Sequence, residues 1–192
     1  MSLKNTRERW GGISQLLHWL IALLILLLGI VGLVMDELPR TPKYFWVYTA
    51  HKSLGLCVLA LVIARLGWRV YAGAPPPVPG TPTWQHRIAT LTHGLLYLLV
   101  LAMPLSGWLY DSASGLRPFR WFGLVDVPKL SAPDEQLRQV SHFFHEWGFW
   151  LLIALVVLHA GAALYHHLFL HDATLARMLP RGRLSPKTEE TP

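Results

Sequence analysis

Histidines placed inside apolar segments are the residues of this sequence best suited to chemistry. Ten of the 192 residues are histidine, and several of them interrupt long runs of Leu, Val and Ile. An unpaired imidazole in a hydrocarbon environment is costly, so each of these rings needs a partner. A hydrogen bond to a neighbouring helix explains any single ring, but imidazole is also the commonest protein ligand for metals. The spacing of the rings has to decide between these two explanations.

Two histidines towards the C-terminus share one helical face at two depths. His145 and His159 are 14 residues apart, which is about 21 Å along a helix and within about 40° of four full turns. His51 lies at the depth expected for His145, and His18 lies at the depth expected for His159. Paired in this way, the four rings predict two stacked b-type haems held between the helices of a bundle. Bis-imidazole ligation leaves no open position on the iron, which favours electron transfer over oxygen activation.

The other histidines are weaker candidates for ligands. His93 lies near the inner end of its apolar segment and remains an alternative ligand at that depth. His142 is rotated by about 100° from the shared face, so we place it on the outer surface. His166 shares the face, but pairing with His145 would span about 31 Å, the full hydrocarbon thickness, so we place it at the inner interface. The remaining three are expected to be solvated or interfacial: His86, His167 and His171.

Four apolar segments are long enough to carry these histidines across a membrane. A bilayer core of about 30 Å needs about 20 apolar residues, and the qualifying segments are about 13–35, 45–70, 88–110 and 143–170. The composition agrees, because 53% of the residues are apolar and only 15% are charged, against about 25% in soluble proteins. We predict an all-α, integral membrane four-helix transmembrane bundle that forms a single domain over residues 1–192. Glycines within the segments would let a macrocycle or another helix approach closely: Gly29, Gly32, Gly55, Gly94, Gly107, Gly148 and Gly161.

The polar segments between the spans predict the topology. The connection at 111–141 contains a short polar helix beginning near Ser131, and residues 171–192 form a polar tail. Four spans leave both termini on one side, where we count ten basic residues against seven on the other. The positive-inside rule therefore predicts cytoplasmic termini and a periplasmic 111–141 connection. The first apolar run is too long for a cleavable signal peptide and is read as the first span.

Charge and cysteine content exclude some classes of function. The formal net charge is +6, but the basic residues lie between apolar runs and form no basic stripe, which argues against nucleic-acid binding. The single cysteine, Cys57, rules out an internal disulfide and an iron–sulfur cluster held by this chain alone.

Four motifs point to one family. They are the segment 14–19 around His18, the segment that begins at His51, the segment 91–97 around His93, and a long block that begins at His145 and includes 158–167 and 172–180. On these residues the sequence resembles the bacterial cytochrome b561 family, four-span dihaem proteins of the inner membrane, over about residues 14–181. The resemblance implies that the axial ligands of two haem b irons are His18, His51, His145 and His159, in agreement with the depth argument. It also implies a location in the bacterial inner membrane.

One branch of that family is similar in length and closing motif, and its members oxidise superoxide at the periplasmic face and reduce ubiquinone. The resemblance therefore implies a superoxide:quinone oxidoreductase. Superoxide is a small anion and needs a positive docking surface, although solvated loop charges are the simpler explanation of any single cation. The outer candidates are Lys52, Arg117, Arg120, Lys129 and Arg138, of which Lys52, Arg117 and Arg120 are the first choices for docking. The candidates for a quinone pocket near the inner haem are His93, His166, Arg65 and Arg69.

Two other functions remain open from the sequence. The chain could be a cytochrome b electron-relay subunit that accepts electrons from a partner dehydrogenase or hydrogenase, or a haem-free membrane channel or structural protein. The short loops favour a self-contained protein over a subunit. An intense Soret band would exclude the haem-free alternative.

Overall fold

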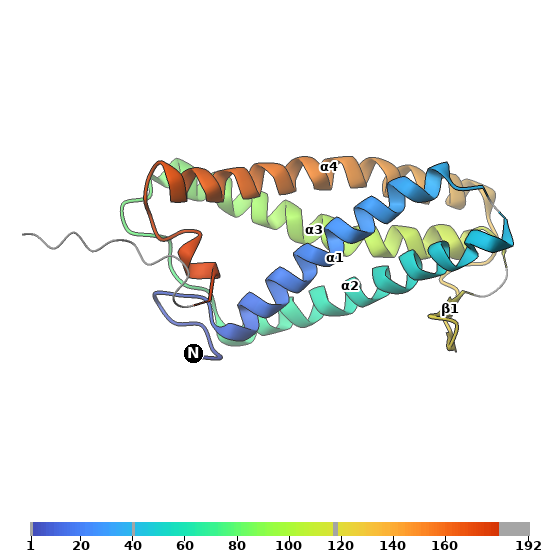
Figure 1. Ribbon diagram of the computed structural model, residues 1–192, viewed down its shortest axis with the longest axis horizontal. Helices are drawn as coiled ribbons and strands as arrows, with labels where there is room; N and C mark the ends of the chain where they lie inside the picture. Colours follow the sequence, from blue (N-terminus) through green and yellow to red (C-terminus); the bar gives the residue numbers. More distant parts are fainter. Residues whose placement is uncertain (1, 40, 117–118, 181–192) are drawn as a thin grey trace, which may run out of the picture.

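The computed structural model describes residues 2–39, 41–116 and 119–180, and in them four long helices form an elongated bundle (Figure 1). The helices are α1 (Gly12–Glu37), α2 (Phe45–Ala72), α3 (Thr83–Ala113) and α4 (Glu135–Leu168). All four are long and apolar enough to cross a membrane. Neighbours in sequence pack side by side, α1 on α2, α2 on α3 and α3 on α4. The predicted all-α membrane bundle is thereby confirmed.

Local chemistry explains where the helices begin and end. Gly73 follows the last residue of α2 and has a φ of 71°. Glycine adopts such a positive φ at little cost, and a proline-rich stretch follows it. Pro82 precedes the first residue of α3. The side chain of Asp134 caps α4 by accepting a hydrogen bond from the Leu137 amide at 2.9 Å. Pro104 lies inside α3, where it removes one backbone donor from the helix.

The connection between the last two helices is shorter than the sequence indicates. It runs over 114–134 and not 111–141, because α3 continues to Ala113 and α4 already begins at Glu135. The polar helix expected near Ser131 is not a separate element, since these residues lead directly into the first turns of α4. The apolar segment begins only at about residue 143, because the first turns of α4 are polar and hydropathy does not detect them. The connection instead holds a small antiparallel hairpin, β1 (Arg120–Trp121) and β2 (Val125–Asp126).

Two 3₁₀ turns and a set of hydrogen bonds complete the ends of the bundle. The turn η1 (Pro42–Tyr44) precedes α2, and η2 (Ala176–Met178) follows α4. The Arg9 guanidinium donates to the carbonyls of Ala176 and Leu179 at 2.8 and 2.7 Å, which ties the N-terminal segment to η2. We call this the termini end and the opposite one the hairpin end; they lie at the left and the right of Figure 1. The tail residues 181–192 lie outside the described residues.

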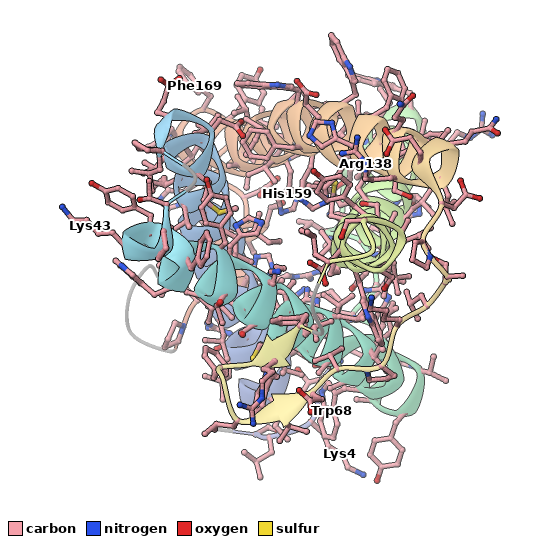
Figure 2. All side chains as sticks on the ribbon, turned by 90° about the vertical axis from the view of Figure 1, so that its right-hand side faces the viewer. Lys4, Lys43, Trp68, Arg138, His159 and Phe169 are labelled. Atoms are coloured by element: carbon pink, nitrogen blue, oxygen red, sulfur yellow. The ribbon has the colours of Figure 1, made fainter. Side chains whose placement is uncertain are left out.

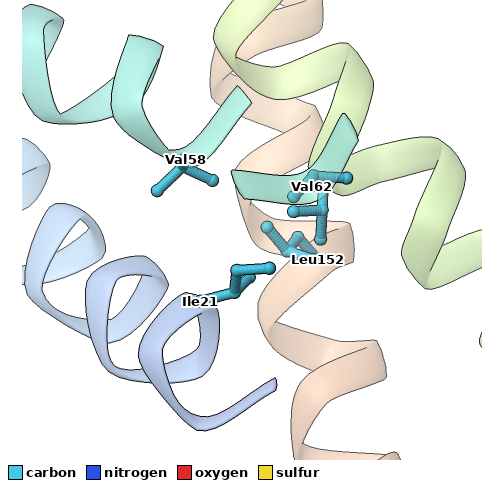
Figure 3. Close-up of a cluster of buried hydrophobic side chains, with 5 residues drawn as sticks. Ile21, Val58, Val62 and Leu152 are labelled. Atoms are coloured by element: carbon cyan, nitrogen blue, oxygen red, sulfur yellow. The ribbon is translucent and has the colours of Figure 1, made fainter. Parts of the chain in front are cut away.

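The buried core is small and lies near the middle of the bundle. It consists of Ile21, Val58, Val62, Val100 and Leu152, four of which are labelled in Figure 3. Leu152 is seven residues from both His145 and His159, so this apolar cluster separates the two histidine depths. Most other large apolar side chains are exposed on the outside of the bundle, as expected where lipid is the solvent.

Candidate metal centres

The four predicted ligand histidines meet in two pairs, each of which joins two helices. His18 of α1 faces His159 of α4, with ring centroids 6.2 Å apart and planes at 83°. His51 of α2 faces His145 of α4, again at 6.2 Å and with planes at 77°. Figure 2 looks along the bundle from the hairpin end and shows His159 in its interior. The fourth helix thus supplies one ring to each pair.

The separation of the rings fits an iron between two imidazoles. A metal–nitrogen distance of about 2 Å on each side, added to the size of the rings, would place the two centroids about 6 Å apart. Among the described residues, no three His, Cys, Asp or Glu side chains gather closely enough to hold a metal ion alone. Two imidazoles without a third protein ligand suit a metal whose other ligands come from a macrocycle. The pairs therefore fit haem iron better than a bare ion.

The His145 ring is held in place by α3. Its Nδ1 lies 3.0 Å from the Met103 carbonyl oxygen and 3.1 Å from the Ser106 hydroxyl. A carbonyl only accepts hydrogen bonds, so this contact places the proton on Nδ1 and leaves Nε2 free to bind a metal. Gly107 makes room for the ring, because a Cβ built on it would lie 3.0 Å from His145 Cε1.

The partner ring, His51, lies against a glycine as well. A Cβ on Gly32 would lie 3.5 Å from His51 Cε1, which is ordinary van der Waals contact. The Nδ1 atom of His51 is buried and has no hydrogen-bond partner among the described residues. Buried imidazole nitrogens are usually hydrogen-bonded, so the described residues leave the polar groups of this ring incompletely satisfied, which fits a site that also holds a bound group.

At the termini end a third histidine joins the pair formed by His18 and His159. The His93 ring centroid lies 5.2 Å from that of His159, edge to face. This distance is shorter than the separation of about 6 Å expected across a metal, so the geometry favours His18 as the partner of His159. His93 is nevertheless close enough to contact a group bound between them.

Two arginines of α2 lie beside this group. Arg65 donates to the Tyr97 hydroxyl at 3.4 Å and to the Ser14 carbonyl at 3.3 Å. The guanidinium of Arg69 lies 5.8 Å from the centre of the Tyr97 ring and 5.5 Å from that of Trp10. The predicted quinone residues Arg65, Arg69 and His93 therefore gather at one end of the bundle, together with Tyr97, which the sequence did not single out.

His166, the fourth predicted quinone residue, is engaged with the segment after α4. Its Nδ1 lies 2.5 Å from Asp172 Oδ2, and both side chains are less than one-fifth exposed. Partial burial raises the pKa of Asp172, but the hydrogen bonds from His166 and Thr174 outweigh it and hold that pKa below its ordinary value of 3.8. The ionised carboxylate is thus favoured at neutral pH.

The predicted docking cations at the hairpin end are largely paired. Lys52 forms a 2.8 Å ion pair with Asp111, and its ammonium lies 5.0 Å from the centre of the Phe119 ring. Arg120 pairs with Asp126 at 3.2 Å across the hairpin. The other cations there also have partners, since Lys129 donates to the Leu116 carbonyl and Arg138 pairs with Glu135. Arg117 lies outside the described residues.

Among these groups Lys52 is distinctive for its position. It follows His51 directly, and its side chain is 33% exposed, so it is accessible from outside while adjacent to a candidate ligand. Its acidic partner was missed from the sequence, because nothing local in the chain relates Asp111 to a lysine 59 residues earlier.

Comparisons with known proteins show which family the chain belongs to. The prokaryotic cytochrome b561 family matches residues 9–181. Cytochrome b561 homolog 2 of Escherichia coli (strain K12) is 36% identical over 187 residues, which cover 95% of this chain and 97% of that protein. Cytochrome b561 homolog 1 of the same organism is 31% identical over 92% of this chain and 99% of that protein. A probable superoxide oxidase, CybB of Yersinia pestis, is 31% identical over 87% of this chain and 93% of its own length.

Proposed function

Because this chain belongs to the prokaryotic cytochrome b561 family of b-type haem-binding membrane electron-transfer proteins, we propose that it carries electrons from superoxide to ubiquinone through two haems b. The observation that carries the proposal is the two histidine pairs, which have the same ring separation of 6.2 Å at two depths of one bundle. The name of the Yersinia relative supports superoxide as the donor.

The histidines would hold the two haems, His51 with His145 at the hairpin end and His18 with His159 at the termini end. Haem held in this way would supply reversible one-electron chemistry, and two imidazole ligands would favour electron transfer over oxygen activation. The protein contributes the orientation of the rings, chiefly through the hydrogen bond of His145 to the Met103 carbonyl. The apolar cluster around Leu152 excludes water between the two depths.

At the hairpin end, Lys52 is the residue best placed to attract a superoxide anion. Its ammonium is partly exposed and adjoins His51, and the ion pair with Asp111 holds it in a fixed position. Arg117 and Arg120 would add to the positive field at longer range. Both Lys52 and Arg120 have an acidic partner, so the position beside His51, and not the absence of a counter-charge, distinguishes Lys52.

At the termini end, the polar group of Arg65, Arg69 and His93 would contact the head of ubiquinone. Reduction of a quinone to a quinol takes up two electrons and two protons, so the pocket also needs a proton source. The hydrogen-bonded His166 Nδ1 and Asp172 Oδ2 are partly exposed and close to the bundle end, which suits them to pass protons from solvent.

The orientation in the membrane follows from charge. Both described termini lie at one end, and the balance of basic residues favours that end as the cytoplasmic one. The multi-pass protein would then lie in the bacterial inner membrane, with its hairpin end in the periplasm and its quinone pocket near the cytoplasmic face.

The ligand assignment is tested by removing one ring from each pair. The purified His145→Ala protein should lose the hairpin-end haem and keep the other, and His159→Ala should do the reverse, so that each variant retains one haem per chain. Haem content and the reduced-minus-oxidised spectrum measure this. Two haems remaining in both variants would contradict the assignment, and a colourless wild-type protein would overturn the whole proposal.

The donor is tested separately by stopped-flow measurement of superoxide decay with a ubiquinone acceptor. We expect decay faster than spontaneous dismutation, coupled to quinol formation. A protein with two haems but no acceleration would be a relay subunit fed by a partner dehydrogenase or hydrogenase.

A further inference from the structure

The hairpin of residues 119–127 lies on the outside of the bundle, against α2. Ser53 of α2 is fully buried, and the hairpin covers it, since the Phe122 amide donates to Ser53 Oγ at 2.8 Å and Trp121 Nε1 donates to its carbonyl at 3.3 Å. Ser53 is two residues from His51, or about 200° around the helix. The hairpin therefore packs on the face of α2 opposite the histidine pair.

Much of that α2 face is exposed to the surroundings of the bundle. Trp46 lies seven residues before Ser53 on the same side and is 69% exposed. Ala60 and Gly67 lie seven and fourteen residues after Ser53 on the same stripe and are exposed as well. Ile63 borders this stripe, about 80° around the helix from Ser53, and is 57% exposed. Figures 1 and 2 show the hairpin outside α2, on the side away from α3 and α4. Ser53 interrupts a stripe that otherwise faces lipid.

The depth of the contact also places the hairpin within the membrane boundary. Ser53 lies eight residues, or about 12 Å, beyond the start of α2. The 28 residues of α2 span about 42 Å, so a centred hydrocarbon core of about 30 Å leaves about 6 Å of helix outside at each end. Ser53 is then about 6 Å inside the hydrocarbon edge, in the range of about 5–10 Å at which interfacial elements are immersed.

The hairpin itself has a polar base and an apolar tip. Arg120 and Asp126 face each other at its base and neutralise each other. The tip exposes Phe122 by 44%, Leu124 by 69% and Val125 by 60%, a contiguous apolar surface on an element of only a few residues. Such a surface on a loop next to a lipid-facing stripe is unusual in contact with water.

The turn of the hairpin has an aromatic residue at a backbone conformation that disfavours bulky side chains. Phe122 has a φ of 46° and Gly123 a φ of 74°. Positive φ is cheap for glycine and tolerable for asparagine, but it is strained for a bulky residue. Strain of this kind persists where the surrounding structure holds it, and here the bond to Ser53 Oγ does so. The ring at the tip is thus retained at a conformational cost.

We propose that the tip of this hairpin, residues 121–125, is a membrane anchor that inserts into the lipid interface beside α2. The occupant of the apolar surface is lipid, because the surface continues the lipid-facing stripe of α2 at interfacial depth. The anchor fixes the connection that also carries Phe119, whose ring lies against the Lys52 ammonium. This proposal is independent of the electron donor and acceptor.

Spin labels on the haem-loaded protein in nanodiscs test the proposal. In a Cys57→Ala background, a label at Leu124→Cys is compared with a lipid reference, Ile63→Cys, and a water reference, Ala132→Cys, all at exposed positions. A label that collides often with dissolved oxygen lies in lipid, where oxygen concentrates. A label that collides often with a water-soluble nickel chelate lies in water. The haem spectrum of each labelled protein reports its folding.

We expect the label at position 124 to collide with oxygen as at position 63 and to be protected severalfold from the nickel chelate relative to position 132. Adding Phe122→Asn, which suits the positive φ but removes the ring, should increase nickel access at position 124. Nickel access equal to that at position 132 would overturn the proposal. Protection from both reagents would also overturn it, because protein and not lipid would then cover the tip.

Discussion

Replacing Gly107 by alanine tests the hairpin-end haem site without removing a ligand. The added Cβ would lie 3.0 Å from His145 Cε1 and 3.3 Å from its Nδ1, whereas carbon atoms in ordinary contact are about 3.5–4.0 Å apart. The ring must therefore shift by a few tenths of an ångström, which would distort its 3.0 Å contact with the Met103 carbonyl. Disturbing such an outer hydrogen bond typically weakens metal affinity about 10–100-fold.

We expect Gly107→Ala to bind the hairpin-end haem about 10–100-fold more weakly, while the termini-end haem stays in place. Haem titration of the stripped protein, followed by redox potentiometry, measures both sites. Gly67→Ala is the matched control, because Gly67 is also a glycine inside a helix and its Cβ would meet nothing within 4 Å. If the two variants bind haem equally, or if the termini-end haem is the one lost, the reasoning about His145 is wrong.

Three further perturbations address the remaining assignments. His93→Phe should keep two haems per chain but weaken ubiquinone binding, as measured by haem content and by the KM for quinone; loss of a haem would make His93 a ligand. Lys52→Ala should lower the superoxide rate constant by about tenfold and flatten its dependence on salt, whereas Lys43→Ala, also at the hairpin end, should not; equal rates would remove Lys52 from docking. Asp172→Asn should lower the thermal midpoint relative to the wild-type protein by a constant amount at every pH above about 4. As the pH falls further the difference should disappear, because a carboxylate with a depressed pKa stabilises the fold only while it is ionised. A difference that grows towards low pH would contradict the role of the His166–Asp172 contact.

The sequence by itself determined the spans and the depths of the histidines. Long apolar segments predict membrane helices because the bilayer offers no water to an unpaired backbone. The 14-residue spacing of His145 and His159 places both rings on one face at two depths, because an α-helix has a fixed rise and rotation per residue. These are local properties, and they were sufficient for the fold class and for the candidate ligands.

Polar helix ends were harder to predict. The first turns of α4 and the start of α3 extend beyond the apolar segments, so hydropathy placed their boundaries several residues inside the true ones. The cap formed by Asp134 decides where α4 begins, and it is visible only once the chain direction at that point is known.

Only the tertiary structure decided which residues from different helices meet. It places His18 and not His93 at 6.2 Å from His159, pairs Lys52 with Asp111, and sets Gly107 against His145. It also lays the hairpin on the outer side of α2, where Ser53 holds a strained Phe122. Periodicity gives the face and the depth of a side chain on its own helix, but not the rotation or separation of neighbouring helices, which depend on the packing of the whole bundle.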